Sequence, residues 1–157
     1  SGYSNFKWYF YGSGPLKKEL MNNVKNLNLS ENCFFLGNID HQLLLDKYKN
    51  HEIDIVINSS VNIPNIFEGI PVSLMEAMSY SIPVIATDCG STRELIDGKS
   101  GILVNQKDSN ALADAVLGVM TNLDYRQSIG KNGRFKILQE FDTNQNARDL
   151  IKLFNKK

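Results

Sequence analysis

The stretch that decides the fold is residues 67–88, which read FEGIPVSLMEAMSYSIPVIATD. Pro71 suits the first position of a helix, because its missing N–H would be unbonded there in any case. Residues 72–78 are nearly all apolar or small, which predicts a helix that is buried on all sides. Residues 81–83 end this helix, and the apolar residues 84–86 predict a central strand.

Two carboxylates stand in this otherwise apolar stretch. Glu76 lies between one and two turns into the predicted helix, and Glu68 lies just ahead of it. Carboxylates are rarely buried without a partner, so both are candidates to face the space above the helix N-terminus. Free N–H groups and the helix dipole suit that end to a phosphate. A carboxylate beside such a site can accept hydrogen bonds from sugar hydroxyls.

The spacing alone also allows a structural interpretation of the two glutamates. In that interpretation Glu68 caps the helix N-terminus and Glu76 pairs with a nearby arginine or lysine, since buried ion pairs also occur. Two glutamates eight residues apart are common by chance. The two carboxylates by themselves therefore leave both interpretations open.

The ordered set of motifs is more specific than either glutamate. It consists of EGIPVSLMEAM at residues 68–78, IPVIATD at 82–88 and GILV at 101–104, with Gly90, Glu94 and Gly98 between them. This set closely resembles the C-terminal domain of the retaining glycosyltransferases of family 4, the group 1 glycosyltransferases. The resemblance spans roughly residues 8–154 and is densest from 54 to 104. It implies the two-domain GT-B fold and a nucleotide-sugar donor site in this chain.

The resemblance also implies roles for individual residues. Glu68 is the candidate catalytic residue: it would contact and orient the donor sugar without acting as a nucleophile. Glu76 would bind the ribose hydroxyls. Backbone N–H groups of the turn would hold the pyrophosphate, and the donor-binding candidates there are Gly69, Ile70, Pro71, Val72 and Ser73. Gly69 would allow a tight turn or a close approach to the ligand.

A second loop is a candidate for contact with the nucleotide base. Gly37, Asn38 and Ile39 follow a predicted strand at what should be the carboxyl edge of the sheet, where open α/β folds bind ligands. In the family the corresponding loop lies near the base. A plain connecting turn is the alternative, and nothing in the loop identifies the base.

Strands alternate with helices along the chain, which predicts an α/β fold with a Rossmann-like, mainly parallel sheet and helices on both faces. The strands are predicted at residues 7–11, 32–37, 53–57, 84–86 and 102–104. The helices are predicted at 16–27, 41–48, 72–78, 93–96, 108–120, 125–130, 132–141 and 143–154. Relative to the family, this is the C-terminal half of a GT-B fold without its first strand and with a helical C-terminus.

Several other features have modest structural interpretations. The Gly12-Ser13-Gly14 turn favours a tight strand-to-helix connection over phosphate binding. His41 and His51 are interpreted as solvated or capping residues. Residues 61–66 look like an insertion relative to the family, and they could line the sugar pocket, touch a partner domain or form a plain surface loop. Arg93 is an exposed arginine or a partner for a motif carboxylate.

Composition limits the function classes. The 157 residues are expected to form a single nucleotide-sugar-binding domain over 1–157. The formal net charge is zero, which argues against a general nucleic-acid binder. Cys33 and Cys89 are far apart and favour reduced thiols in a cytoplasmic protein. No cysteine and histidine cluster suggests a metal site, and no apolar run approaches the about 20 residues of a membrane span.

The family pattern implies parts that this sequence does not contain. The family's C-terminal domain opens with a strand and a basic Gly-Arg…Lys segment that neutralises the donor phosphates, and an N-terminal domain binds the acceptor. The chain is therefore expected to be part of an enzyme and to be inactive alone. The C-terminal helix crosses to the N-terminal domain in GT-B proteins. Its amphipathic end and Lys156 and Lys157 also allow contact with a membrane surface.

These observations lead to one prediction of function. The parent protein would transfer a hexose-type unit, with retention, from a nucleotide diphosphate sugar to a glycan or lipid-linked acceptor in bacterial polysaccharide synthesis. It would act in the cytoplasm, with the inner face of the membrane as an alternative site, and would need no cofactor and no metal. The alternatives are a sugar-nucleotide epimerase of the same fold, a non-catalytic nucleotide-sugar-binding module and a plain α/β scaffold.

Overall fold

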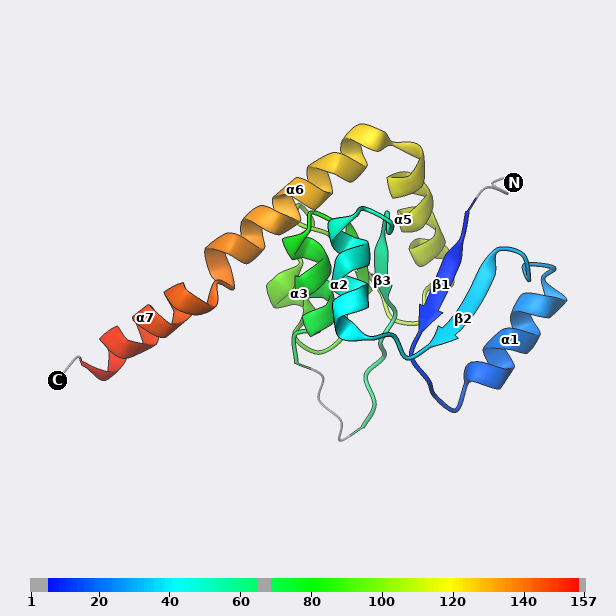
Figure 1. Cartoon of the computed structure of the whole chain (residues 1–157), viewed down its shortest axis with the longest axis horizontal. Helices are drawn as coiled ribbons and strands as arrows, with labels where there is room; N and C mark the ends of the chain where they lie inside the picture. Colours follow the sequence, from blue (N-terminus) through cyan, green and yellow to red (C-terminus); the bar gives the residue numbers. More distant parts are fainter. Residues whose placement is uncertain (1–5, 65–68, 156–157) are drawn as a thin grey trace. The chain divides into compact units, whose positions relative to one another are not determined.

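The computed structural model describes residues 6–64 and 69–155 (Figure 1). The candidate catalytic residue Glu68 lies outside the described residues. The chain divides into two compact units, Ser1–Asp46 and Lys47–Lys157. The expectation of a single domain over residues 1–157 stays a prediction.

The first unit contains two parallel strands, β1 (Trp8–Tyr11) and β2 (Cys33–Gly37), and the helix α1 (Lys17–Asn26). Phe10 lies opposite Phe35 in the register, and their stacked rings are 4.5 Å apart between centroids. The strand predicted at residues 7–11 is therefore present as β1, but its residues are only half-buried or exposed. Tyr9 is 39% exposed, because alternate side chains of a strand point to opposite faces.

Glycine geometry shapes the turn between β1 and α1. Gly12 has a φ of 107°, a conformation that favours glycine, and its N–H donates to the carbonyl oxygen of Gly37 over 2.7 Å. The N–H of Lys17 at the start of α1 donates to the oxygen of Gly14 over 3.2 Å. The tight strand-to-helix connection predicted from the sequence is confirmed.

Helix α2 (His41–Lys49) has local signals at both ends. The carboxylate of Asp40 accepts the N–H of Leu43 over 3.1 Å, as expected for an N-cap residue. Beyond the helix, His51 adopts a φ of 55°, and its N–H donates to the oxygen of Tyr48 over 3.1 Å. The capping interpretation of His51 is therefore confirmed.

The second unit is built on a three-stranded parallel sheet in the order β3 (Val56–Asn58), β4 (Val84–Thr87), β5 (Ile102–Val104). Every residue of β4 is buried, so the prediction of a central strand is confirmed. The strand predicted at 53–57 begins later, at Val56. The first hydrogen bond between the two segments runs from the N–H of Val56 to the carbonyl oxygen of Pro83 over 3.0 Å. Pro83 has no N–H and cannot donate a hydrogen bond in return.

Helices cover both faces of this sheet, as the sequence predicts. Helix α3 (Val72–Ser79) packs on β3 and β4, and α5 (Ser109–Thr121) packs on β4 and β5. Figure 1 shows these two helices on opposite sides of β3. The cluster on the α5 side is centred on Ile85, Val119 and Ile129. Side chains of β4 point alternately to the two faces of the sheet, so the residues on either side of Ile85 point toward α3.

Helix α3 corrects two details of the prediction. Leu74, Ala77 and Met78 are fully buried, but Val72 is 60% exposed, so the helix buries one face and not its whole circumference. Val72 and Ser73 in the first turn are exposed, whereas Leu74 in the same turn is fully buried. Pro71 is the N-cap and not the first helical residue, because its ψ of 116° is extended.

The C-terminal region contains one long helix where the sequence predicts two. Helix α6 (Leu123–Glu140) runs unbroken through Gly130 and Gly133. A Cβ at Gly130 would collide with the carbonyl oxygen of Ser81, and a Cβ at Gly133 would lie 2.9 Å from the oxygen of Ser100. The glycines therefore allow close packing of the helix and do not end it.

Two shorter helices complete the second unit. Helix α4 (Thr92–Leu95) follows β4, and α7 (Thr143–Phe154) follows α6. Asp142 caps α7 by accepting the N–H of Gln145 over 2.8 Å. The apolar residues Leu150, Ile151, Leu153 and Phe154 are all more than half exposed. Among the described residues, no helix is both long and apolar enough to cross a membrane.

Candidate functional site

The candidate site lies at the carboxyl edge of the β3-β4-β5 sheet. Because the three strands are parallel, their last residues, Asn58, Thr87 and Val104, lie at the same edge. Helix α3 follows β3 in the chain and packs back on β3 and β4, so its N-terminus also starts at this edge. Open α/β sheets bind their ligands here.

The N-terminus of α3 presents backbone donors. The carbonyl oxygen of Pro71 accepts the N–H groups of Leu74 over 3.1 Å and Met75 over 3.4 Å. The N–H groups of Val72 and Ser73 come earlier in the first turn, where a helix has no carbonyl partner of its own, and both residues are exposed. This end of the helix is chemically suited to bind an anion.

The surroundings of Gly69 distinguish between its two expected roles. Its φ lies outside the left-handed region, so the turn itself does not require glycine. No described atom lies within 4 Å of where a Cβ would stand. Close approach of a ligand to this open backbone stays a prediction, as do the binding roles of Ile70, Pro71, Val72 and Ser73.

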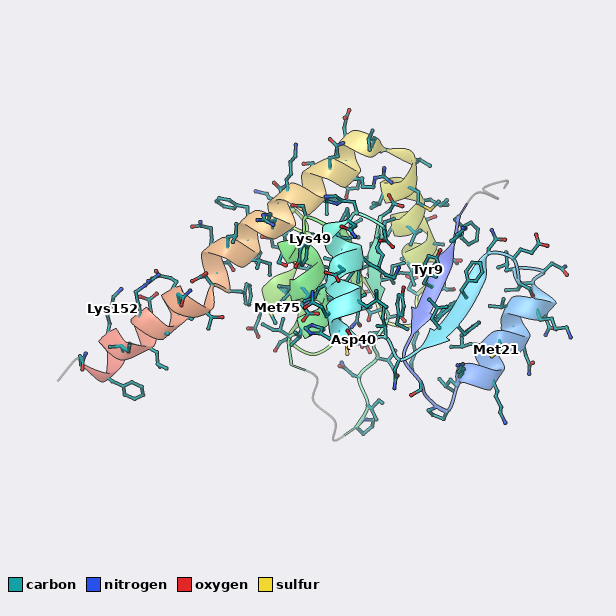
Figure 2. The ribbon with its side chains drawn as sticks, in the orientation of Figure 1. Tyr9, Met21, Asp40, Lys49, Met75 and Lys152 are labelled. Carbon is teal, nitrogen blue, oxygen red and sulfur yellow. The ribbon has the colours of Figure 1, made fainter. Side chains whose placement is uncertain are left out.

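Glu76 lies on the same face of α3 as the exposed first turn. It is four residues after Val72 and three after Ser73, and such residues share one helix face. Side chains in a helix also lean toward its N-terminus, which directs Glu76 toward the candidate anion site. Glu76 is half-buried, next to Met75, which Figure 2 labels on α3. Its proposed contact with ribose and its alternative ion pair both stay predictions.

The loop after β3 is tied to the other strand ends by side-chain amides. The N–H of Asn62 donates to Oε1 of Gln106 over 2.7 Å. Oδ1 of Asn62 accepts two hydrogen bonds, one from Sγ of Cys89 over 3.1 Å and one from the N–H of Gly90 over 3.3 Å. Nε2 of Gln106 donates to the carbonyl oxygen of Asp88 over 2.6 Å. The described part of the predicted insertion thus contacts the strand edge.

Sequence reasoning did not single out Asn62 or Gln106. Their partners lie 18 to 44 residues away in the sequence, and asparagine and glutamine are ordinary loop residues. The available signal is the position of each residue shortly after a predicted parallel strand. Strand ends meet at one edge, so polar residues that follow them are candidates for mutual contact.

Arg93 satisfies both of its predicted interpretations. Its guanidinium pairs with the carboxylate of Asp88, the last residue of the IPVIATD motif at 82–88, and its side chain is 72% exposed. The hydrogen bond to Asp88 raises the pKa of Arg93 above its ordinary value. Because the pair is exposed to solvent, its contribution to stability is small.

Both cysteines are free thiols, as the sequence predicts. Burial raises the pKa of the Cys33 thiol, which lowers its reactivity as a nucleophile. Cys89 is buried and donates to Asn62. Within residues 6–64 and 69–155, no group of three or more histidine, cysteine or acidic side chains forms a metal-binding cluster.

The loop of Gly37, Asn38 and Ile39 belongs to the first unit. Gly37 ends β2 with a φ of 70° and accepts the N–H of Gly12, so the loop lies at the carboxyl edge of the β1-β2 pair. Asn38 is exposed and Ile39 is half-buried. The structure places the loop within its own unit, and its predicted contact with a nucleotide base stays a prediction.

Comparison with known proteins relates this chain to one family. The family model described as "Glycosyl transferases group 1" matches residues 2–136. The chain is 32% identical over 155 residues to the putative colanic acid biosynthesis glycosyltransferase WcaL of Salmonella typhimurium. That match covers 94% of this chain and 37% of WcaL.

Solved structures agree with this relationship. The C-terminal domain of LpcC, a glycosyl transferase group 1 family protein from Francisella tularensis, superposes with a TM-score of 0.70 at 31% identity, over 82% of this chain and 63% of that one. A variant of TarM from S. aureus, crystallised with Fondaparinux, alpha-GlcNAc-glycerol and UDP, gives a TM-score of 0.74 at 25% identity. The match covers 95% of this chain and 29% of TarM, so the chain spans well under half of either WcaL or TarM.

Proposed function

The chain belongs to the glycosyl transferases group 1 family, and from this we propose that it is the donor-binding part of a retaining glycosyltransferase. Its α/β architecture is that of the C-terminal half of the GT-B fold. The substrate bound here would be a nucleotide diphosphate sugar. The acceptor and the N-terminal domain that binds it would belong to the rest of the parent protein.

One observation carries this proposal most directly. The exposed N-terminus of α3 stands at the carboxyl edge of the sheet, and Glu76 lies on the same helix face. A diphosphate fits the helix end through backbone N–H groups, and a ribose one turn away fits the carboxylate. The TarM structure, which contains UDP, supports a nucleotide ligand for this fold.

The chemistry of transfer would be mainly electrostatic. Negative charge develops on the nucleoside diphosphate as the bond to the sugar breaks, and N–H groups already directed at the phosphates stabilise that charge. Glu76 would hold the ribose, and the backbone of residues 69–73 would hold the diphosphate. Glu68 would orient the sugar. A basic segment of the parent protein would supply the remaining positive charge, without a metal ion.

The relatives support a bacterial polysaccharide as the product. WcaL is named for colanic acid biosynthesis. We therefore propose a hexose-type donor sugar and a glycan or lipid-linked acceptor for the parent protein. Its place of action would be the cytoplasm, with the inner membrane face as the alternative that a lipid-linked acceptor favours.

The donor site can be tested by titrating the chain with UDP, GDP, ADP and their sugars, using ligand-observed NMR. We expect one nucleotide to bind selectively, and Glu76→Gln to weaken its binding about tenfold, as for loss of a charged hydrogen bond. Glu19→Gln, at an exposed position of α1, is the matched control and should bind as the original chain does. Equal affinity of all three proteins would refute the ribose role of Glu76.

Absence of binding has a defined follow-up. A longer protein that includes the family's basic segment should then bind nucleotide in the same titration. Failure of that longer protein to bind any of the nucleotides would refute the donor-site proposal itself. Retention is tested separately, by comparing the anomeric configuration of donor and product by NMR after transfer by the parent protein.

A further inference from the structure

Three loops at the candidate donor edge are joined by a closed ring of hydrogen bonds. Asn62 in the loop after β3 donates to Gln106 in the turn after β5, and Gln106 donates to Asp88 after β4. Cys89 and Gly90, the next residues, donate back to Asn62. Two amide side chains thus connect the ends of all three strands.

The ring is anchored in the core of the second unit. Cys89 is 2% exposed, and the hydroxyl of Thr87, which is 5% exposed, donates to the carbonyl oxygen of Ser60 in the same loop as Asn62. Asp88 continues the β4-β5 ladder through its N–H, which donates to Val104 over 2.9 Å. The exposed loops therefore take their positions from buried strand ends.

We propose that Asn62 and Gln106 are positioning residues for the donor edge. They act through the backbone of Asp88, Cys89 and Gly90, and they hold this turn at the edge where α3 begins. The inference rests on the proposed function, because the ligand at that edge is the nucleotide diphosphate sugar.

The physical reason for such a ring is preorganisation. A loop that is ordered only when a ligand binds costs free energy at that moment, whereas a loop held in advance does not. Gly90 has a φ of 54°, a conformation that the turn must keep and that the bond to Asn62 Oδ1 helps to fix. A cyclic hydrogen-bond network also constrains its members more than one isolated bond.

The test compares Asn62→Ala, Gln106→Ala and the double variant with the original chain. The probe is whichever of UDP, GDP or ADP binds the original chain, and its affinity is measured by NMR titration. Each single variant removes two hydrogen bonds of the ring, and we expect each to bind the nucleotide about fivefold more weakly. Because either change opens the same ring, the double variant should be no more than about twofold weaker than a single one.

A second readout needs no ligand. The amide resonance of Gly90 should shift in Asn62→Ala, and its hydrogen exchange should become faster, because its acceptor is lost. Gln106→Ala should produce the same change more weakly, because Oδ1 of Asn62 remains. This variant also keeps the test possible if Asn62→Ala does not fold.

Two controls separate positioning from general stability. Asn110→Ala changes an exposed asparagine on α5, and Asp97→Asn removes the ion pair with Lys136 in the loop that precedes β5, at the opposite end of that strand from Gln106. Both should keep the affinity of the original chain at a temperature where all the proteins are folded. If Asp97→Asn weakens binding as much as Asn62→Ala does, the positioning role is refuted.

The remaining outcomes distinguish this inference from the proposed function. If the original chain binds nucleotide and both Asn62→Ala and Gln106→Ala bind it equally well, the positioning role is refuted and the donor site stands. If neither the original chain nor the longer protein binds any of the three nucleotides, the donor site is refuted and the positioning role with it.

Discussion

Ser81 is held in a backbone conformation that usually requires glycine. It follows Tyr80, the C-cap of α3, and has a φ of 62°. Its N–H donates to the carbonyl oxygen of Met78 over 2.9 Å, and the N–H of Ile82 donates to the carbonyl oxygen of Ala77 over 3.0 Å. This is the hydrogen-bonded end that helices commonly form with a left-handed residue. A side chain at such a position costs free energy that glycine avoids.

Replacing Ser81 by glycine should therefore stabilise the protein. We expect Ser81→Gly to raise the free energy of unfolding by about 0.5 kcal/mol, since the relief of left-handed strain exceeds the added freedom of the unfolded chain. Urea unfolding followed by circular dichroism measures the change. Ser128→Gly, at an exposed position inside α6, is the control and should lose about 0.5 kcal/mol. A loss of stability in Ser81→Gly would contradict the argument.

Asp97 carries a pH dependence that can be assigned to one group. Desolvation is the largest single effect and acts to raise its pKa, but the N–H groups of Lys99 and Ser100, the Ser100 hydroxyl and Lys136 all donate to the carboxylate. The hydrogen bonds prevail and hold the pKa of Asp97 well below its ordinary value. The folded state therefore favours the ionised form.

The sign of this effect on stability follows by linkage. A lowered folded-state pKa contributes stability that is fully present above the unfolded pKa of about 3.9 and is lost as the pH falls toward the folded value. We expect Asp97→Asn to be less stable than the original chain at pH 7, with the difference shrinking below pH 4. Unfolding curves from pH 7 to pH 2 measure it. Asp114→Asn, on the exposed side of α5, should show no such convergence.

At the scale of elements, α6 depends on two glycines that let it approach the loops beside β4 and β5. Gly130 packs against the carbonyl of Ser81, and Gly133 packs against Ser100 and Met78. Their function is to remove side chains from a helix contact. This is why α6 remains continuous although glycine disfavours a helix interior.

Alanine at Gly130 should be strongly destabilising. Its Cβ would meet a backbone carbonyl, which cannot turn aside as a flexible side chain can, so we expect a loss of about 2 kcal/mol or more. Gly118→Ala in α5 is the matched control, because, among the described residues, no atom outside the neighbouring turns of the helix lies within 4 Å of where its Cβ would stand. It should gain about 0.5 kcal/mol from better helix propensity. Thermal unfolding of both variants tests the difference, and equal effects would contradict the packing role.

At the scale of the whole molecule, the chain corresponds to only part of the length of its relatives. It spans 37% of WcaL and 29% of TarM. Donor binding and sugar transfer should therefore separate: we expect the chain to bind nucleotide and to transfer no sugar, while the longer parent protein does both. A radiolabelled-donor assay measures transfer. Addition of EDTA should leave the rate of the parent protein unchanged. Transfer by the chain alone at the parent's rate would contradict this division.

The sequence alone determined the elements whose signals are local. The apolar run of β4, the caps at Asp40 and Asp142, and the Gly12 turn each act within a few residues. Alternation of strands and helices then predicted the parallel α/β fold, because few topologies suit that order. The ordered motifs also indicated the family and the edge where the donor would bind.

Tertiary structure alone decided the features that depend on distant partners. The continuity of α6 depends on loops more than 30 residues away from Gly130 and Gly133, and the exposure of Val72 depends on where the packing around α3 ends. The contacts of Asn62 with Gln106, Cys89 and Gly90 join residues 27 to 44 positions apart. A local pattern cannot specify such contacts, because they exist only after the strands have aligned and brought their ends to one edge.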